Sequence, residues 1–144
     1  MAEERLALNE AERRLLDDLL DRARRLVVDG GDEVRDGDLP TLAQLDRWIG
    51  PWTAQPIETR VHANDVVNAF GAVLGAHLCR LLGLQWLLVR DEHGTDFAVH
   101  GDPGDILIFP IDATAKRVER RETGFFEAFV DHVGREVRSI RGES

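Results

Sequence analysis

The sequence is poor in several residue types: it has one cysteine, no tyrosine and a single lysine among its 18 basic residues. A lone cysteine, Cys79, forms no intrachain disulfide, which excludes a disulfide-stapled scaffold and suits a reducing compartment. The first residues also lack the basic stretch and apolar core of a signal peptide. These absences predict a cytoplasmic protein.

The motifs of common catalytic and phosphate-binding sites are missing as well. The chain contains no GxGxxG or GxxxxGK phosphate loop, no HExxH zinc pattern and no GxSxG nucleophile elbow. Cys79 is expected to be a buried, inert thiol, because His77, two residues away, would not face it on a helix. We therefore expect no cofactor, no metal and no catalytic residue, and we favour a protein that is not an enzyme.

Acidic residues outnumber basic ones, 27 to 18, for a formal net charge of −9. They are spread along the chain, and such a surface repels nucleic acid and anionic lipid, so we expect neither as a partner. Residues 66–89 are apolar enough to raise the question of a membrane span. Arg80 lies inside this run and Gly83 interrupts it, which favours a buried helix followed by a buried strand.

The length of 144 residues suits one domain with its own core. We expect a single domain over 1–144, with an N-terminal helical extension at 1–60 and a core at 64–140. Apolar periodicity predicts five helices. Capping boxes mark the first, from Asn9, and the second, from Thr41, and Gly50-Pro51 is expected to end the second. The expected helices are 9–29, 40–49, 64–82, 111–120 and 124–140.

In the third helix, Gly71 and Gly75 lie four residues apart. Small residues at this spacing permit a close approach between backbones. We expect a neighbouring helix or the sheet to lie against them, in preference to a second copy of the chain.

Residues 83–110 read GLQWLLVRDEHGTDFAVHGDPGDILIFP, which is three apolar runs separated by turn-rich loops at 91–95 and 101–105. This pattern predicts a three-stranded antiparallel meander with strands at 85–90, 96–100 and 106–109. The element order is then α-α-α-β-β-β-α-α, an α+β fold. Both faces of the first strand are apolar, so either helices cover both faces of the sheet or one face meets a partner.

Three features are candidates for function. Trp86 is predicted either to lie in the core, which we favour, or to floor a pocket. The acidic hairpin around Asp91 suits a divalent metal or an acid/base pair, but turn formation already explains its residue types. A basic cluster suits a phosphate, a carboxylate or an acidic partner surface, or the C-terminus of a helix, which we favour. That cluster consists of Lys116, Arg117, Arg120 and Arg121.

Several short patterns in the second half of the chain resemble one family. They are Phe70-Gly71, Gly83-Leu84-Gln85-Trp86, Asp91-Glu92-His93-Gly94, Pro110 and Lys116-Arg117-Val118-Glu119. In spacing and residue type they resemble an uncharacterised bacterial family, domain of unknown function 3806, over about residues 64–135. The resemblance implies the same order of helix, strands and helix, and it supplies no activity.

Two functions from different classes fit these observations. The first is a non-enzymatic protein-interaction module, immunity-like or chaperone-like, with a protein partner. The second is a protein that binds or turns over a small polar ligand where Asp91 meets Lys116 and Arg117 near Trp86. Between a ligand site and a salt bridge of Asp91 with the Lys116–Arg117 pair, we favour the salt bridge. Homodimerisation through the third helix is compatible with either function.

Overall fold

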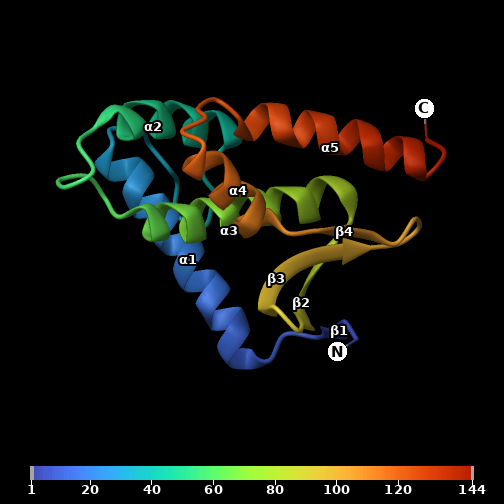
Figure 1. The fold of residues 1–144 in the computed structure, drawn as a ribbon. Helices are drawn as coiled ribbons and strands as arrows, with labels where there is room; N and C mark the ends of the chain where they lie inside the picture. Colours follow the sequence, from blue (N-terminus) through green and yellow to red (C-terminus); the bar gives the residue numbers. More distant parts are fainter. Residues whose placement is uncertain (1, 144) are drawn as a thin grey trace.

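A computed structural model, which describes residues 2–143, has an α+β fold. Within that range it contains five helices and a four-stranded antiparallel sheet of order β1-β2-β3-β4. Figure 1 shows the helices gathered on one side of a curved sheet. The predicted fold class and the predicted order of elements are confirmed, with one further strand at the start of the chain. The elements are β1 (Glu4–Leu6), α1 (Glu10–Asp29), α2 (Leu42–Ala54), α3 (Ala63–Leu82), β2 (Gln85–Asp91), β3 (Gly94–Gly101), β4 (Ile106–Ile108), α4 (Pro110–Glu119) and α5 (Phe126–Ile140).

The additional strand, β1, pairs antiparallel with β2, with Glu4 opposite Arg90 and Leu6 opposite Leu88. Its three residues are too few for a periodic pattern, and two of them are charged. Residues 4–6 adopt an extended conformation because they pair with the apolar strand β2. A strand that depends on its neighbour in this way leaves no signal in the local sequence.

The capping boxes at α1 and α2 form as predicted. The Asn9 side chain accepts a hydrogen bond of 2.8 Å from the Glu12 amide, and the Glu12 carboxylate accepts one from the Asn9 amide. The predicted end of α2 at Gly50-Pro51 is wrong, because the helix continues to Ala54. Its last turn carries Trp52, whose indole is 2 % exposed and donates to the Val61 carbonyl at 2.8 Å. Burying this side chain offsets the main-chain hydrogen bond that a proline removes.

Helix α3 is the central helix, packed against α1, α4 and α5. Gly71 and Gly75 lie at its close contacts, as predicted. A Cβ atom on Gly71 would come within 2.7 Å of the Ile111 Cα atom in α4, and one on Gly75 would collide with the Trp86 ring. Among the described residues α3 is also the one helix whose length and composition would allow a membrane span, a test that buried core helices pass too.

The hydrophobic core runs through the whole helical layer. One cluster of buried side chains joins Leu26 of α1, Ile49 of α2, Phe70 of α3, Val99 of β3 and Phe126 of α5. The N-terminal helices therefore share a core with residues 64–140. The sheet packs its Trp86 face against α3, since Trp86 meets Gly75 there. Helices therefore lie on one face of the sheet in the described part of the chain (Figure 1).

Candidate functional site: a groove beside a free strand edge

The outer strand β4 is much shorter than its neighbour β3, and this leaves part of β3 without a partner. Strand β3 pairs with β2 from Gly94 to His100, but β4 pairs only with Val99, His100 and Gly101. Strand β4 is short because Pro110 comes soon after it as the first residue of α4. Proline lacks an amide N–H and has a helical φ, so the strand cannot continue through it. The chain turns away from the sheet at this point. From Thr95 to Ala98, β3 has a strand neighbour on its β2 side alone.

Hairpin geometry determines which main-chain groups face the open side. Asp91 and Gly94 lie opposite each other across a two-residue turn, Glu92-His93, and such flanking residues form a hydrogen-bonded pair. By alternation, Asp96 and Ala98 also bond to β2, whereas the N–H and C=O groups of Thr95 and Phe97 point away from it. Within residues 2–143 these outward groups have no hydrogen-bond partner.

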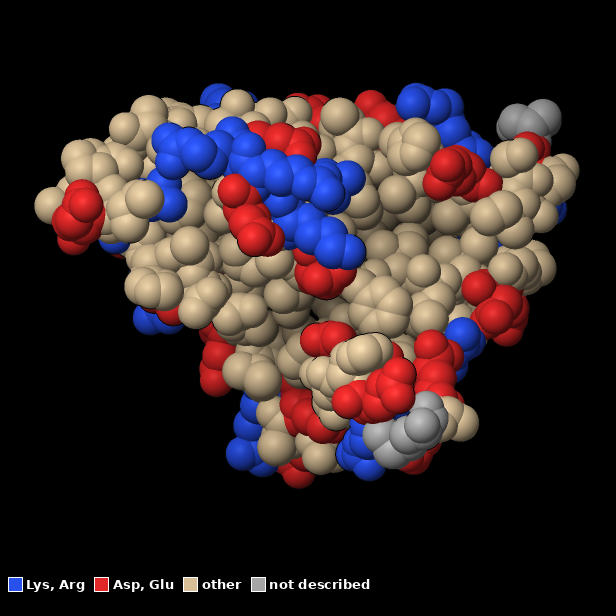
Figure 2. All heavy atoms as spheres, viewed as in Figure 1, with Lys and Arg blue, Asp and Glu red and all other residues tan. Residues whose placement is uncertain are grey.

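A groove of about 350 Å³ runs along this free edge, between the start of α3, the start of β3 and the start of α4. Figure 2 shows it as a hollow below α4, with acidic side chains on both sides. The lining residues are Asn64, Val67, Asn68, Thr95, Asp96, Phe97, Ile111, Asp112 and Ala115.

The lining of this groove suits recognition of a polar chain. Two side-chain amides, Asn64 and Asn68, donate and accept hydrogen bonds, as the outward main-chain groups do. The charged lining residues, Asp96 and Asp112, are both acidic. Lys116 Nζ lies 3.0 Å from Asp112 Oδ2, and this ion pair is exposed. The groove therefore presents hydrogen-bonding groups and negative charge, without a cysteine, serine or histidine among its lining residues.

Among the described residues, Asp91 does not form the predicted salt bridge with Lys116 and Arg117, and a ligand site at these residues stays a prediction. Asp91 Oδ1 accepts a hydrogen bond of 2.8 Å from the His93 amide inside the turn. Its position along β2 puts it on the sheet face opposite Trp86. Arg117 donates to the Ala113 carbonyl at 3.0 Å and lies over the Phe129 ring of α5, 4.7 Å from its centroid. Lys116 alone comes near the groove, through Asp112.

The predicted basic cluster does form a patch, and Figure 2 shows lysine and arginine side chains gathered over α4. Some of its members also hold the fold together. Arg121 donates to the Thr53 carbonyl at 3.0 Å, at the C-terminal end of α2, where a cation is favoured by the helix dipole. Arg60 reaches the same carbonyl oxygen at 3.4 Å. Arg120 lies 3.8 Å from Glu122 in an exposed pair. Binding of a partner by this patch stays a prediction.

Trp86 combines both predicted roles. It is half-buried, packs edge-on against Phe97 and touches α3 at Gly75. It also lines a second groove, of about 670 Å³, with Arg13, Asp17 and Cys79. Burial raises the pKa of the Cys79 thiol to about 11, so the reactive thiolate is scarce at neutral pH.

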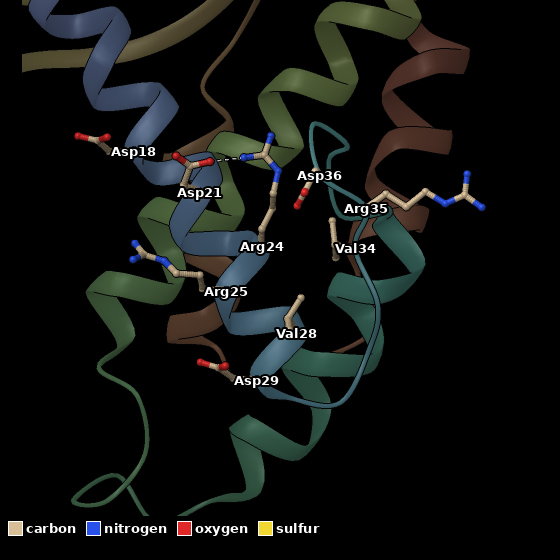
Figure 3. Close-up of a pocket in the computed structure, with 9 residues that line it drawn as sticks. All are labelled: Asp18, Asp21, Arg24, Arg25, Val28, Asp29, Val34, Arg35 and Asp36. Carbon is tan, nitrogen blue, oxygen red and sulfur yellow. Dashed lines mark hydrogen bonds and ion pairs between the residues drawn. The ribbon is translucent and has the colours of Figure 1, made fainter.

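A third and larger hollow, of about 760 Å³, lies between α1 and the loop that follows it. Its side chains are mostly charged, with both signs present. Figure 3 shows Arg24 paired with Asp21, whereas Asp18 and Arg25 point to one side of α1 and Arg35 points to the opposite side of the view. Because the charges do not converge on a common point, the hollow has the character of a solvated surface.

The acidic turn between β3 and β4 holds a compact cluster of His100, Asp102 and Asp105, whose ligand atoms lie within 4.8 Å of one another. Arg5 and His100 both contact Asp105 Oδ1, at 2.8 Å and 2.7 Å, and Asp102 accepts from the Asp105 amide. The pKa of Asp105 is lowered by the hydrogen bond from Arg5 first and by that from His100 second. Through Asp105, the Arg5 side chain ties β1 to this turn.

Local sequence patterns do not distinguish the residues that line the groove from their neighbours. Asn64 and Asn68 fit equally well as exposed positions of a helix. The available signal was Pro110, because a proline after a short strand limits how far that strand can cover its neighbour.

In comparisons with known proteins, the model of a domain of unknown function, DUF3806, matches residues 53–129. No curated protein matches the chain in sequence. In fold, the chain is similar to a protein from Bacteroides thetaiotaomicron VPI-5482 whose crystal structure was determined at 1.50 Å resolution. The TM-score is 0.70 at 14 % identity, and the match covers 92 % of this chain and 48 % of that one. This chain therefore spans about half the length of that protein, and the similarity concerns the fold alone.

The matched segment includes every residue that lines the groove beside β3, from Asn64 to Ala115. The groove beside Trp86 is lined in part by Arg13 and Asp17, which lie outside the matched segment. A site shared by domains of this kind must be built from residues inside the matched segment. Of the two, only the β3 groove meets that condition.

Proposed function

The chain belongs to the DUF3806 family, a domain of unknown function, and from its groove we propose that it is a non-enzymatic module that binds a partner protein along the free edge of β3. An immunity-like or chaperone-like role, which requires binding without turnover, is consistent with such a module.

The observation that carries the proposal is the unpaired edge of Thr95 and Phe97 at the side of a polar groove. An open strand edge is a template for another chain, and proteins usually shorten, charge or cover such edges. Here β4 covers three of the eight residues of β3 and stops, and the uncovered part borders a groove with space for a partner. Main-chain groups of this kind are the recognition elements of peptide-binding sheets.

The reactive groups of the chain support binding over catalysis. The Cys79 thiol has a raised pKa and so has little nucleophilic thiolate. The carboxylate of Asp105 is engaged with both the His100 imidazole and the Arg5 guanidinium. The groove itself is lined by amides, carboxylates and apolar side chains. None of these arrangements joins a nucleophile to a base.

Site-specific photo-crosslinking tests the proposal. A photo-reactive amino acid is placed at Thr95, where its side chain lines the groove, and at Glu136 on the exposed face of α5 as a matched control. In the cells that naturally make the protein, we expect a covalent adduct of defined mass from position 95 and none from position 136. The absence of a protein adduct at position 95 would contradict the proposal.

A second candidate function, binding of a small polar molecule, is favoured by the groove beside Trp86. Its volume lies in the range of ligand sites, and Arg13 and Asp17 supply polar groups on an otherwise largely apolar lining. A ligand that binds only the native state raises the unfolding midpoint. Thermal unfolding against divalent metals, nucleotides and metabolites would reveal it. We would assign a shift to this groove if Arg13→Ala abolishes it and Asp112→Asn leaves it intact.

A further inference from the structure

The free edge of β3 defines the form and the charge of its occupant. Resting on the interaction function above, we propose that the partner inserts an extended segment carrying lysine or arginine, which adds to β3 as a new strand beyond the end of β4.

The hydrogen-bonding pattern of β3 supports strand addition. Strand β4 lies opposite Val99 and Gly101, which have the same parity along β3 as Thr95 and Phe97. The row of outward N–H and C=O groups that pairs with β4 therefore continues along β3 past the end of β4, where these groups have no strand partner. An added strand would lie in line with β4, and Pro110 and Ile111 would mark where it meets α4. At about 3.3 Å per residue, an extended segment of about four residues spans Thr95 to Ala98.

The charge of the groove selects the chemistry of the segment. Alternate side chains of an added strand point to the same face, so some of them face the α3 and α4 wall with Asn64 and Asp112. Asp112 is paired with Lys116, whose side chain is 59 % exposed. Exposed pairs of this kind contribute little to stability, so an incoming lysine or arginine can replace Lys116 at little cost. An acidic segment would meet Asp96 and Asp112 unfavourably.

A basic segment from another protein also fits better than a second copy of this chain. Each copy carries a net charge of −9, so two copies repel each other at long range. The negative surface that opposes self-association attracts a basic segment and speeds its encounter.

The position of Thr95 allows a direct test of strand addition. Its amide N–H points to the free edge and not to β2, so Thr95→Pro removes one outward donor while the β2 ladder stays intact. Thr95→Val is the matched control, because it keeps the N–H and favours the strand conformation. Circular dichroism and thermal unfolding establish that both variants fold.

The probes are fluorescent peptides of alternating valine and lysine, with a matched set in which glutamate replaces lysine. Fluorescence anisotropy should show binding of the lysine peptide to wild type and to Thr95→Val with dissociation constants equal within about twofold. Thr95→Pro should weaken it by about tenfold, the effect of roughly one hydrogen bond. Asp112→Asn should weaken binding of the lysine peptide and reduce the difference in affinity between the lysine and glutamate peptides.

Several outcomes overturn the inference: no binding of the lysine peptide, equal binding of the glutamate peptide, or equal affinities of Thr95→Pro and Thr95→Val. Concentration-dependent dimerisation that Thr95→Pro abolishes would also overturn it, because the occupant would then be a second copy. The interaction function is tested separately by the crosslink at position 95. If that adduct forms although peptides do not bind, strand addition is wrong and the interaction function stands; if neither occurs, both are wrong.

Discussion

Trp86 lies directly against Gly75, so that a methyl group added to this glycine would collide with the indole ring and would lie 2.9 Å from Pro110 Cγ. We predict that Gly75→Ala destabilises the protein by about 1–3 kcal/mol, the usual effect of overpacking a core. The control is Gly50→Ala in α2, where an added Cβ has no neighbour within 4 Å. Alanine there should be neutral or stabilising by about 0.5–1 kcal/mol. Urea unfolding of the two variants measures both effects, and equal stabilities would contradict this packing.

The Arg5–Asp105 contact predicts a pH dependence. Hydrogen bonds from Arg5 and then His100 hold the pKa of Asp105 below its usual value. A carboxylate with a lowered folded-state pKa stabilises the protein above the pKa of the unfolded chain, about 3.9, and the contribution is lost as the pH falls through the folded-state value. Arg5→Gln should raise the pKa of Asp105 toward normal, as measured by NMR titration of its carboxyl carbon. An unchanged titration would mean that the contact does not persist in solution.

Cys79 should react slowly with thiol reagents. With a pKa of about 11, about one thiol in a thousand is ionised at pH 8, compared with roughly one in four for a free cysteine. We expect native protein to react with a disulfide reagent at least about a hundredfold more slowly than protein unfolded in urea. The absorbance of the released thiolate gives both rates. A native rate close to the unfolded rate would reopen the possibility of a nucleophilic role.

Helix α5 takes its N-terminal cap from a distant residue. The Asp46 carboxylate in α2 accepts hydrogen bonds of 2.8 Å from the Phe126 amide and 3.1 Å from the Glu127 amide. Asp46→Ala should destabilise the protein by about 0.5–2 kcal/mol, as loss of a cap does. Asp46→Asn keeps one hydrogen-bond acceptor and should lose less stability than Asp46→Ala. The control, Asp18→Ala on the exposed face of α1, should have little effect on stability. Denaturant unfolding separates these variants, and identical losses for Asp46→Ala and Asp18→Ala would exclude the cap.

The features that the sequence predicts correctly are local ones. The capping residues Asn9 and Thr41 each bond to a partner three residues away, so their signal is complete within one turn of helix. The spacing of Gly71 and Gly75 likewise indicates close contacts, although it does not identify Ile111 and Trp86 as the neighbours. Pro51 is misleading because a buried residue beyond it, Trp52, outweighs its local preference.

The candidate site is harder to predict because it depends on register and on strand length. The sequence suggests a five-residue loop from Asp91 to Thr95, whereas the hairpin closes with a two-residue turn. A change of this kind decides which residues pair across the hairpin, and it places Asp91 in a strand pair with Gly94. The groove arises because β3 is eight residues long and β4 three. The predicted strands are of nearly equal length and leave no free edge.

The most direct test of the account is amide hydrogen exchange of the protein alone, followed by NMR residue by residue along β3. We predict alternation: the amides of Asp96 and Ala98, bonded to β2, exchange slowly, and those of Thr95 and Phe97 exchange quickly because their edge is free. Slow exchange at all four positions would contradict the account, because the edge on which both proposals depend would then be occupied.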